Sequence, residues 1–168
     1  MNEQLGIYVG NAEWQIGKMV GIVEGLTSEQ MTWTPPGVHN SLSWLAGHFA
    51  GVLWECYGLA SHGEIPANLS ESGIPAGWLR NLTYDERAPL PGTTGNERAA
   101  YLREAWAVLK SYLVEYHPAW EAVQVVRPPD EHKSMWWMLH HCLIDGAYHT
   151  GQASYLKMLL ASREGPPK

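Results

Sequence analysis

The chain has 168 residues, of which 45% are hydrophobic, and a formal net charge of −6. This size and composition suffice for one continuous core, so we expect a single domain over residues 1–168. The 11 basic residues are scattered along the chain and outnumbered by 17 acidic ones. This charge pattern excludes nucleic acid as an expected partner.

No targeting segment is visible in the sequence. Its start lacks the basic stretch and apolar run of a secretory signal. The most apolar stretch, residues 134–160, contains Asp145 and three histidines, which disfavours a membrane span. Cys56 and Cys142 lie in apolar helical patterns and are interpreted as small buried side chains. We therefore expect a cytoplasmic protein.

The first predicted element is a long helix. Apolar residues recur at three- and four-residue spacing over residues 4–26. Thr27 and Gln30 then have the spacing of a capping box, in which each side chain bonds the other residue's backbone. We expect a short helical turn here, ended by Pro35.

The second long helix is predicted from a cap at Asn40 or Ser41 to about residue 59. Glu55 is its only formally charged residue, so the helix must be covered on most sides. Residues 61–94 are rich in glycine, proline, asparagine and serine. They are predicted to form a long loop that contains a short helix at residues 78–82.

The third predicted helix begins at Thr94 or Asn96. Its apolar positions repeat at three and four residues while its charges fall elsewhere, which is typical of a surface helix of a bundle. Pro118 ends the pattern. Residues 120–126 are left open between a short extended stretch and a further turn.

The last predicted helix covers residues 134–162, and Asp145 is its only formal charge between residues 134 and 156. A helix that is apolar all round is buried or lies in a subunit interface. Four long helical patterns without a convincing alternating strand predict an all-α helical bundle. Two nearly uncharged helices in so short a chain also favour a homodimer that covers them.

Polar groups recur along the last helix at four-residue spacing, which places them on one face. This stripe, extended at both ends by apolar residues, comprises Trp137, His141, Asp145, His149, Gln152 and Leu156. Because the pattern assigns this face to the core, its ionisable groups need partners or a metal ion. His48 lies in an apolar segment of the second helix, and a bundle can bring it opposite the stripe.

Two interpretations of these groups remain open at this point. His48, Asp145 and His149 would form a site with two imidazoles, one carboxylate and open positions, as catalytic metal ions have. Alternatively, Asp145 pairs with a cation such as Arg103 or Lys110, and the histidines are satisfied core residues. Spacing alone does not decide between them.

Residues 139–152, LHHCLIDGAYHTGQ, resemble the C-terminal signature helix of the DinB-like superfamily of metalloenzymes. That family typically has His-x-x-x-His, then a small or basic residue and Gly-Gln. Residues 40–44, NSLSW, together with His48, are similar to the start of the family's second helix and its other ligand histidine. Residues 26–35 resemble its link between the first two helices.

The resemblance implies an up-down-down-up four-helix bundle with a long middle loop. It also implies a metal ion held by His48, Asp145 and His149, although Asp145 replaces the family's histidine. A set of two histidines and one carboxylate accepts zinc, nickel, iron or manganese. Further residues are assigned as a substitute ligand or as groups that orient ligands or substrate: His141, Tyr148 and Gln152.

The function implied by the resemblance is that of a metal-dependent hydrolase or of a transferase that uses a low-molecular-weight thiol. The expected partner is then a small-molecule substrate or thiol. One alternative is a non-catalytic dimer whose Trp-lined cavity binds a small molecule. Another is a stress-associated protein that lost its metal through the exchange at Asp145.

Overall fold

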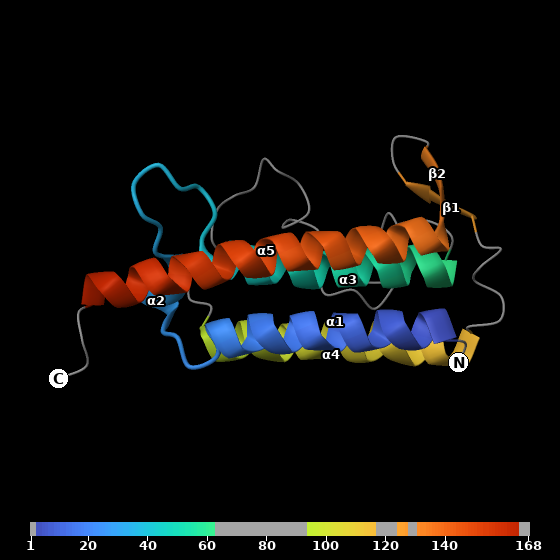
Figure 1. Cartoon of the computed structure of the whole chain (residues 1–168), viewed down its shortest axis with the longest axis horizontal. Helices are drawn as coiled ribbons and strands as arrows, with labels where there is room; N and C mark the ends of the chain where they lie inside the picture. Colours follow the sequence, from blue (N-terminus) through green and yellow to red (C-terminus); the bar gives the residue numbers. More distant parts are fainter. Residues whose placement is uncertain (1–2, 63–93, 117–123, 128–130, 165–168) are drawn as a thin grey trace.

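The structure, a computed structural model, describes residues 3–62, 94–116, 124–127 and 131–164. Four long helices run along its longest axis (Figure 1): α1 (Glu3–Val23), α3 (Leu42–His62), α4 (Gly95–Tyr116) and α5 (Met135–Glu164). The smaller elements are α2 (Ser28–Thr32) and the strands β1 (Gln124–Arg127) and β2 (Glu131–Ser134).

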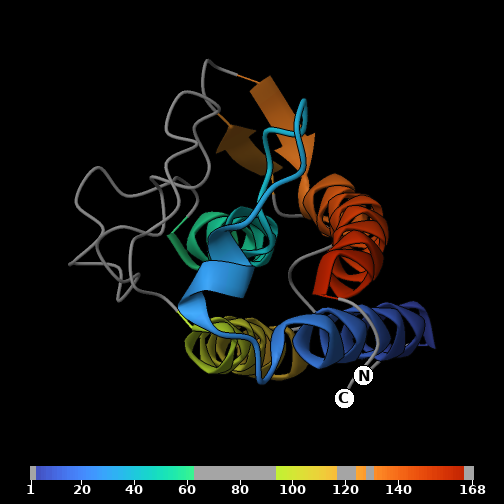
Figure 2. The same cartoon turned by 90° about the vertical axis from the view of Figure 1, so that its left-hand side faces the viewer.

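The four long helices form a bundle with one helix at each corner. Seen end-on, α1 neighbours α4 and α5, and α3 neighbours the same two helices (Figure 2). The sequence colours of Figure 1 show that α1 and α5 run in one direction and α3 and α4 in the other. This confirms the predicted all-α, up-down-down-up bundle. The predicted middle loop, with its short helix at 78–82, falls almost wholly outside the described residues.

Helix α3 is the most deeply buried element. Every side chain from residue 42 to 58 is buried except those of His48 and Tyr57, which are partly exposed. Even Glu55, its only charged residue, is buried. The prediction that this helix is covered on most sides is confirmed, and its few polar groups therefore lie where water is scarce.

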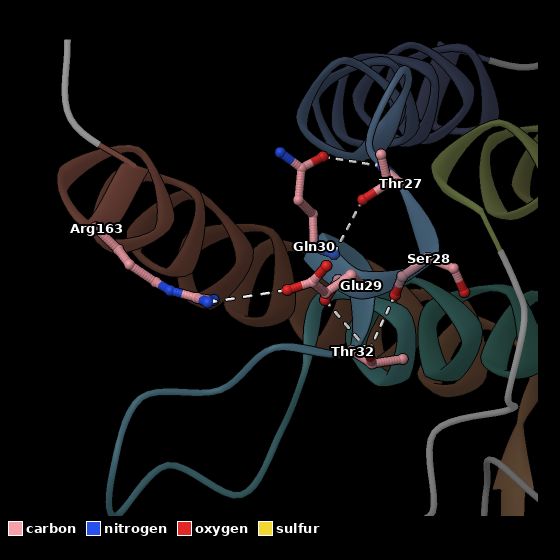
Figure 3. Close-up of polar contacts among 6 residues, drawn as sticks. All are labelled: Thr27, Ser28, Glu29, Gln30, Thr32 and Arg163. Carbon is pink, nitrogen blue, oxygen red and sulfur yellow. Dashed lines mark hydrogen bonds and ion pairs between the residues drawn. The ribbon is translucent and has the colours of Figure 1, made fainter.

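Polar side chains mark the helix starts as predicted. Around α2 the capping box is complete: Thr27 Oγ1 accepts from Gln30 N, and Gln30 Oε1 accepts from Thr27 N (Figure 3). Ser41 caps α3 by accepting from the backbone N–H three residues on. At α4, Thr94 and Glu97 bond each other's backbone N–H reciprocally. Such caps each stabilise a helix by about 1 kcal/mol.

Helix α2 is tied to the far end of α5 by exposed contacts. The guanidinium of Arg163 reaches toward the Glu29 carboxylate, with 3.9 Å between Nη2 and Oε1 (Figure 3). The same guanidinium lies over the ring of Trp33. Exposed pairs of this kind add little stability, so they mainly orient the segment that leads into α3.

Helix α1 is shorter than predicted, α3 continues to His62 beyond the expected residue 59, and the open region before the last helix takes one of its two alternatives. Helix α1 ends at Val23, before the expected residue 26, because Gly25 adopts a φ of 82° that only glycine accepts easily. Residues 124–127 take the extended alternative and pair with β2 in antiparallel register, with Val125 opposite Lys133. This hairpin is too short to produce a recognisable alternating pattern, so the sequence did not predict a strand pair.

The apolar helices carry both thiols. Cys56 and Cys142 are free and buried, as predicted. Cys56 Sγ lies 3.6 Å from the carbonyl oxygen of Met138 and donates to it. In the part of the chain that the structure describes, no helix is long and apolar enough to cross a membrane.

Gly146 sets the spacing between α5 and two of its neighbours. A Cβ at this position would lie 2.5 Å from two ring carbons of Phe49 on α3 and 2.7 Å from Gln15 Oε1 on α1. Real side chains do not tolerate such contacts, and a ring wedged in a packed core cannot move away easily. A glycine therefore keeps the helices close beside Asp145.

We predict that Gly146→Ala lowers the free energy of unfolding by about 1–3 kcal/mol, as overpacking does in other cores. The matched control is Gly17→Ala on α1, where the new Cβ meets no described atom within 4 Å. That change is expected to raise stability by up to about 1 kcal/mol, because alanine is the better helix former. Urea unfolding followed by circular dichroism measures both, and equal effects would contradict the packing argument.

Candidate metal centre

Three side chains from two helices meet at the contact between α3 and α5. His48 comes from α3, and Asp145 and His149 lie one helical turn apart on α5. Asp145 Oδ2 is 3.2 Å from His48 Nε2, and Asp145 Oδ1 is 3.3 Å from His149 Nε2. One ligand atom from each residue lies within 4.8 Å of the others. The carboxylate thus sits between two imidazoles.

The cations considered as alternative partners for Asp145 are engaged elsewhere. Arg103 Nη2 pairs with Glu24 Oε1 at 2.8 Å, and Lys110 pairs with Glu13. Both pairs are exposed and link α4 to the region of α1. The interpretation that either residue neutralises Asp145 is therefore wrong.

Asp145 is ionised at neutral pH. Burial acts to raise the pKa of its carboxyl, but the imidazoles of His149 and His48 outweigh burial and hold that pKa well below its usual range. The His48 contact lacks hydrogen-bond geometry, and Asp145 Oδ2 is a buried oxygen without a hydrogen bond among the described residues. A partly buried anion with one buried, unsatisfied oxygen is poorly solvated and favours a cation beside it.

His149 is held in the tautomer that suits a metal ligand. Its Nδ1 lies 2.8 Å from Gln152 Oε1, and an amide oxygen can only accept, so Nδ1 carries the hydrogen. With Nδ1 engaged by Gln152, Nε2 faces Asp145 Oδ1 and is the nitrogen that can carry either the proton that lowers the pKa of Asp145 or a metal ion. Two facing acceptors at 3.3 Å require a cation or a shared proton between them.

Trp44 fixes both imidazoles. Its indole stacks on His48 with 4.7 Å between ring centroids and 8° between planes, and it meets His149 edge-on at 5.6 Å. The two imidazoles also contact each other edge to face at 4.7 Å. Trp44 is buried, so it limits ring rotation and closes one side of the site to water. Trp44 belongs to the NSLSW segment, but this role was not predicted from the sequence, although the spacing of one turn from His48 could have suggested it.

The polar stripe of α5, which was predicted to face the core, is exposed at its N-terminal end. Side chains four residues apart advance about 40° around a helix of 3.6 residues per turn, so the stripe winds around α5. His149 and Leu156 are buried, whereas Trp137 is exposed. His141 stacks on Trp137 with 5.0 Å between centroids and lies outside the group of converging ligand atoms.

The other predicted site residues are placed differently. Tyr148 is exposed, and its ring lies edge-on to His149 with 5.2 Å between centroids. Gln152, assigned to orienting ligands or substrate, accepts a hydrogen bond from a candidate ligand. Orientation of ligand histidines by such neighbours is general in metal sites.

The donor set fits a divalent cation. It offers two imidazole nitrogens and one anionic oxygen, with one histidine tautomer already fixed and one buried oxygen unsatisfied. Sites with three protein ligands leave room for water or substrate. Fold and site together define an all-α bundle protein with a candidate three-ligand metal centre between two helices.

Comparison with known proteins gives the family. The family model described as mycothiol-S-transferase matches residues 9–161, and the chain therefore belongs to this family, which is DinB-like. A crystal structure described as a conserved protein from Enterococcus faecalis has a TM-score of 0.74 at 17% identity. That match covers 95% of this chain and 98% of the other, and it supports the fold alone. No curated protein matches this chain.

We predict a pH-dependent effect of Asp145→Asn on the metal-free protein. Because the pKa of Asp145 is lower in the folded than in the unfolded chain, its charge stabilises the fold above the unfolded pKa of about 4. That contribution is lost as pH falls toward the folded-state pKa. The variant should therefore be less stable than wild type at pH 7, by an amount that shrinks below about pH 4.

Chelator-treated samples unfolded in urea between pH 7 and pH 3 measure this effect. Glu13→Gln is the control, because Glu13 belongs to an exposed pair and its loss should matter little at any pH. If Asp145→Asn is less stable than wild type by the same free energy of unfolding at every pH down to 3, the lowered pKa assigned to Asp145 is wrong.

Proposed function

We propose that this protein is a divalent-metal-dependent S-transferase that uses a low-molecular-weight thiol such as mycothiol. The observation that carries the proposal is the convergence of His48, Asp145 and His149 in a chain of the mycothiol-S-transferase family. The proposal is supported by the unsatisfied Asp145 Oδ2 and by the orientation of His149 Nε2 toward Asp145 Oδ1, where a metal ion could take the place of a proton. Iron, manganese, nickel and zinc all suit two imidazoles and one carboxylate.

In this proposal His48, Asp145 and His149 hold the ion. A bound divalent ion would lower the pKa of a coordinated thiol and so make a thiolate available at neutral pH. The same centre could activate water for hydrolysis, and the family match favours the thiol. The transfer joins the thiol sulfur to an electrophilic carbon of the second substrate, whose leaving group departs with the bond electrons.

The surrounding residues take distinct roles in this proposal. Gln152 keeps the Nε2 lone pair of His149 available by accepting from Nδ1. Trp44 keeps both imidazoles in orientation and excludes water from one side. Tyr148 and His141 lie on the more exposed side of α5, and we assign them to orienting the substrate at the mouth of the site. We also propose that the protein acts in the cytoplasm as a homodimer.

We predict near-stoichiometric metal in the purified, untagged protein, measured by elemental analysis. His48→Ala and His149→Ala should each lose most of it, because each removes one of three ligands. His39→Ala is the control, since His39 is exposed in the segment before α3. Absence of metal after reconstitution with iron, manganese, nickel and zinc would sink the proposal.

Activity is then tested with mycothiol and other small thiols against an electrophile such as a bimane halide. Thioether formation should depend on the metal and fall to background in both ligand variants. Metal binding without turnover of any thiol would leave the centre in place but overturn the transferase assignment. If the same samples hydrolyse ester or amide substrates instead, the protein is a hydrolase and not a transferase.

We predict that Gln152→Leu weakens metal binding by about 10- to 100-fold, as loss of a partner of a ligand histidine does elsewhere. Gln152→Glu keeps an acceptor for His149 Nδ1 and should retain most of the affinity. Competition with a chromogenic chelator gives both constants. Equal affinities of Gln152→Leu and wild type would show that the hydrogen bond does not prepare His149.

A further inference from the structure

Helix α5 carries a second regular face besides the one that forms the metal centre. It consists of large exposed apolar residues and is here called the α5 stripe: Trp137, Ile144, Tyr148, Tyr155 and Met158. Their exposed fractions range from 37% for Trp137 to 70% for Ile144. When His141 and Gly151, which lie on the same face, are included, successive positions are four and three residues apart in alternation. This spacing is a seven-residue repeat.

A seven-residue apolar repeat is typical of a helix that packs along its length against another helix. Within the bundle, α5 packs against α1 and α3 with its other faces (Figure 2). The α5 stripe contains no formal charge, although the chain as a whole carries −6. A continuous uncharged patch on so acidic a surface indicates a protein contact.

The order of residues along the stripe favours a second copy of the same chain. Tyr148 lies three residues before Gly151, and Tyr155 lies four residues after it. Ile144 and Met158, both apolar, lie seven residues before and seven residues after it. Such a palindrome matches itself when two helices cross antiparallel, because a two-fold axis pairs each position with its mirror position.

Gly151 points to the same arrangement. A Cβ at this position meets no described atom within 4 Å, so the described chain does not require glycine here. Glycine inside a helix costs about 1 kcal/mol relative to alanine. Gly146, in contrast, is required by Phe49 and Gln15. A glycine at the centre of the palindrome lets two helix backbones approach closely.

The area of the patch is sufficient. The five large side chains expose roughly 600 Å² in total, since each presents about 150–250 Å² when fully exposed. The stripes of two copies together would bury up to about 1,200 Å², which is the lower end of the range for stable interfaces.

We propose that two copies associate through an antiparallel contact of their α5 stripes, with the two-fold axis at Gly151. Tyr148 of one copy then lies beside Tyr155 of the other. Tyr148 also contacts His149 within its own chain, so the second copy forms an outer wall of the metal centre. The inference specifies the homodimer proposed above but does not rest on the presence of a metal.

The test uses the full chain at about 10 µM in sedimentation equilibrium. Wild type should be a dimer, and Ile144→Glu and Tyr155→Glu should each weaken it by at least about 30-fold, as central interface residues do. Val114→Glu is the control, because Val114 is a similarly exposed apolar residue on α4. Circular dichroism confirms that each variant is folded.

A second variant tests the geometry directly. Gly151→Cys places two thiols at the proposed axis, so mild oxidation should link the copies, whereas Gly17→Cys on α1 should not. Monomeric wild type, or a dimer that tolerates both glutamates and fails to cross-link at residue 151, would overturn the interface. Elemental analysis of the same samples shows whether metal is bound, so failure of the interface can be distinguished from failure of the metal proposal.

Discussion

The candidate site depends on one partly buried carboxylate that joins two helices. Asp145 projects from α5 to His48 on α3 and also faces His149 on its own helix. An anion with restricted access to water is costly, so the surrounding residues must hold these donors at fixed distances. Gly146 brings α5 close to Phe49 on α3. Trp44 limits the rotation of both imidazoles, and Gln152 fixes the hydrogen on Nδ1 of His149. The pKa of Asp145 is strongly lowered because this arrangement holds both imidazoles beside its carboxylate.

Preorganisation explains why the site lies on these two helices. Helix α3 is almost fully buried, and the buried Trp44 stacks on the partly exposed ring of His48, which limits its rotation. Backbone hydrogen bonds of α5 keep Asp145 and His149 in register, one turn apart. A site carried by rigid helices keeps its donors together without a loop that must fold over them. In the proposed transferase, a substrate would approach from the more exposed side of α5, where Tyr148 lies.

The sequence predicted the helices well because their periodicity and caps are local properties. Thr27 with Gln30, Ser41 and Thr94 mark helix starts through contacts three residues apart. The resemblance brought together His48, Asp145 and His149, which spacing alone left open. The contact of Trp44 with both imidazoles was missed, although its spacing of one turn from His48 could have suggested it. The pairing of the basic residues of α4 with Glu24 and Glu13 depends on three-dimensional contacts and was not predictable. The winding of the polar stripe was predictable in principle, because each four-residue step advances about 40°.

The two faces of α5 have a consequence for how this chain tolerates insertions and deletions. Ile144 and Asp145 are adjacent, yet one faces solvent and the other faces His48. Adding one residue between positions 137 and 158 would rotate everything beyond it by about 100°. The candidate metal ligands would then turn outward on one side of the change, and apolar rings would turn into the site. Length changes in this segment therefore preserve the orientation of both faces only near whole numbers of turns, for example seven or eleven residues, each of which leaves a rotation of about 20°.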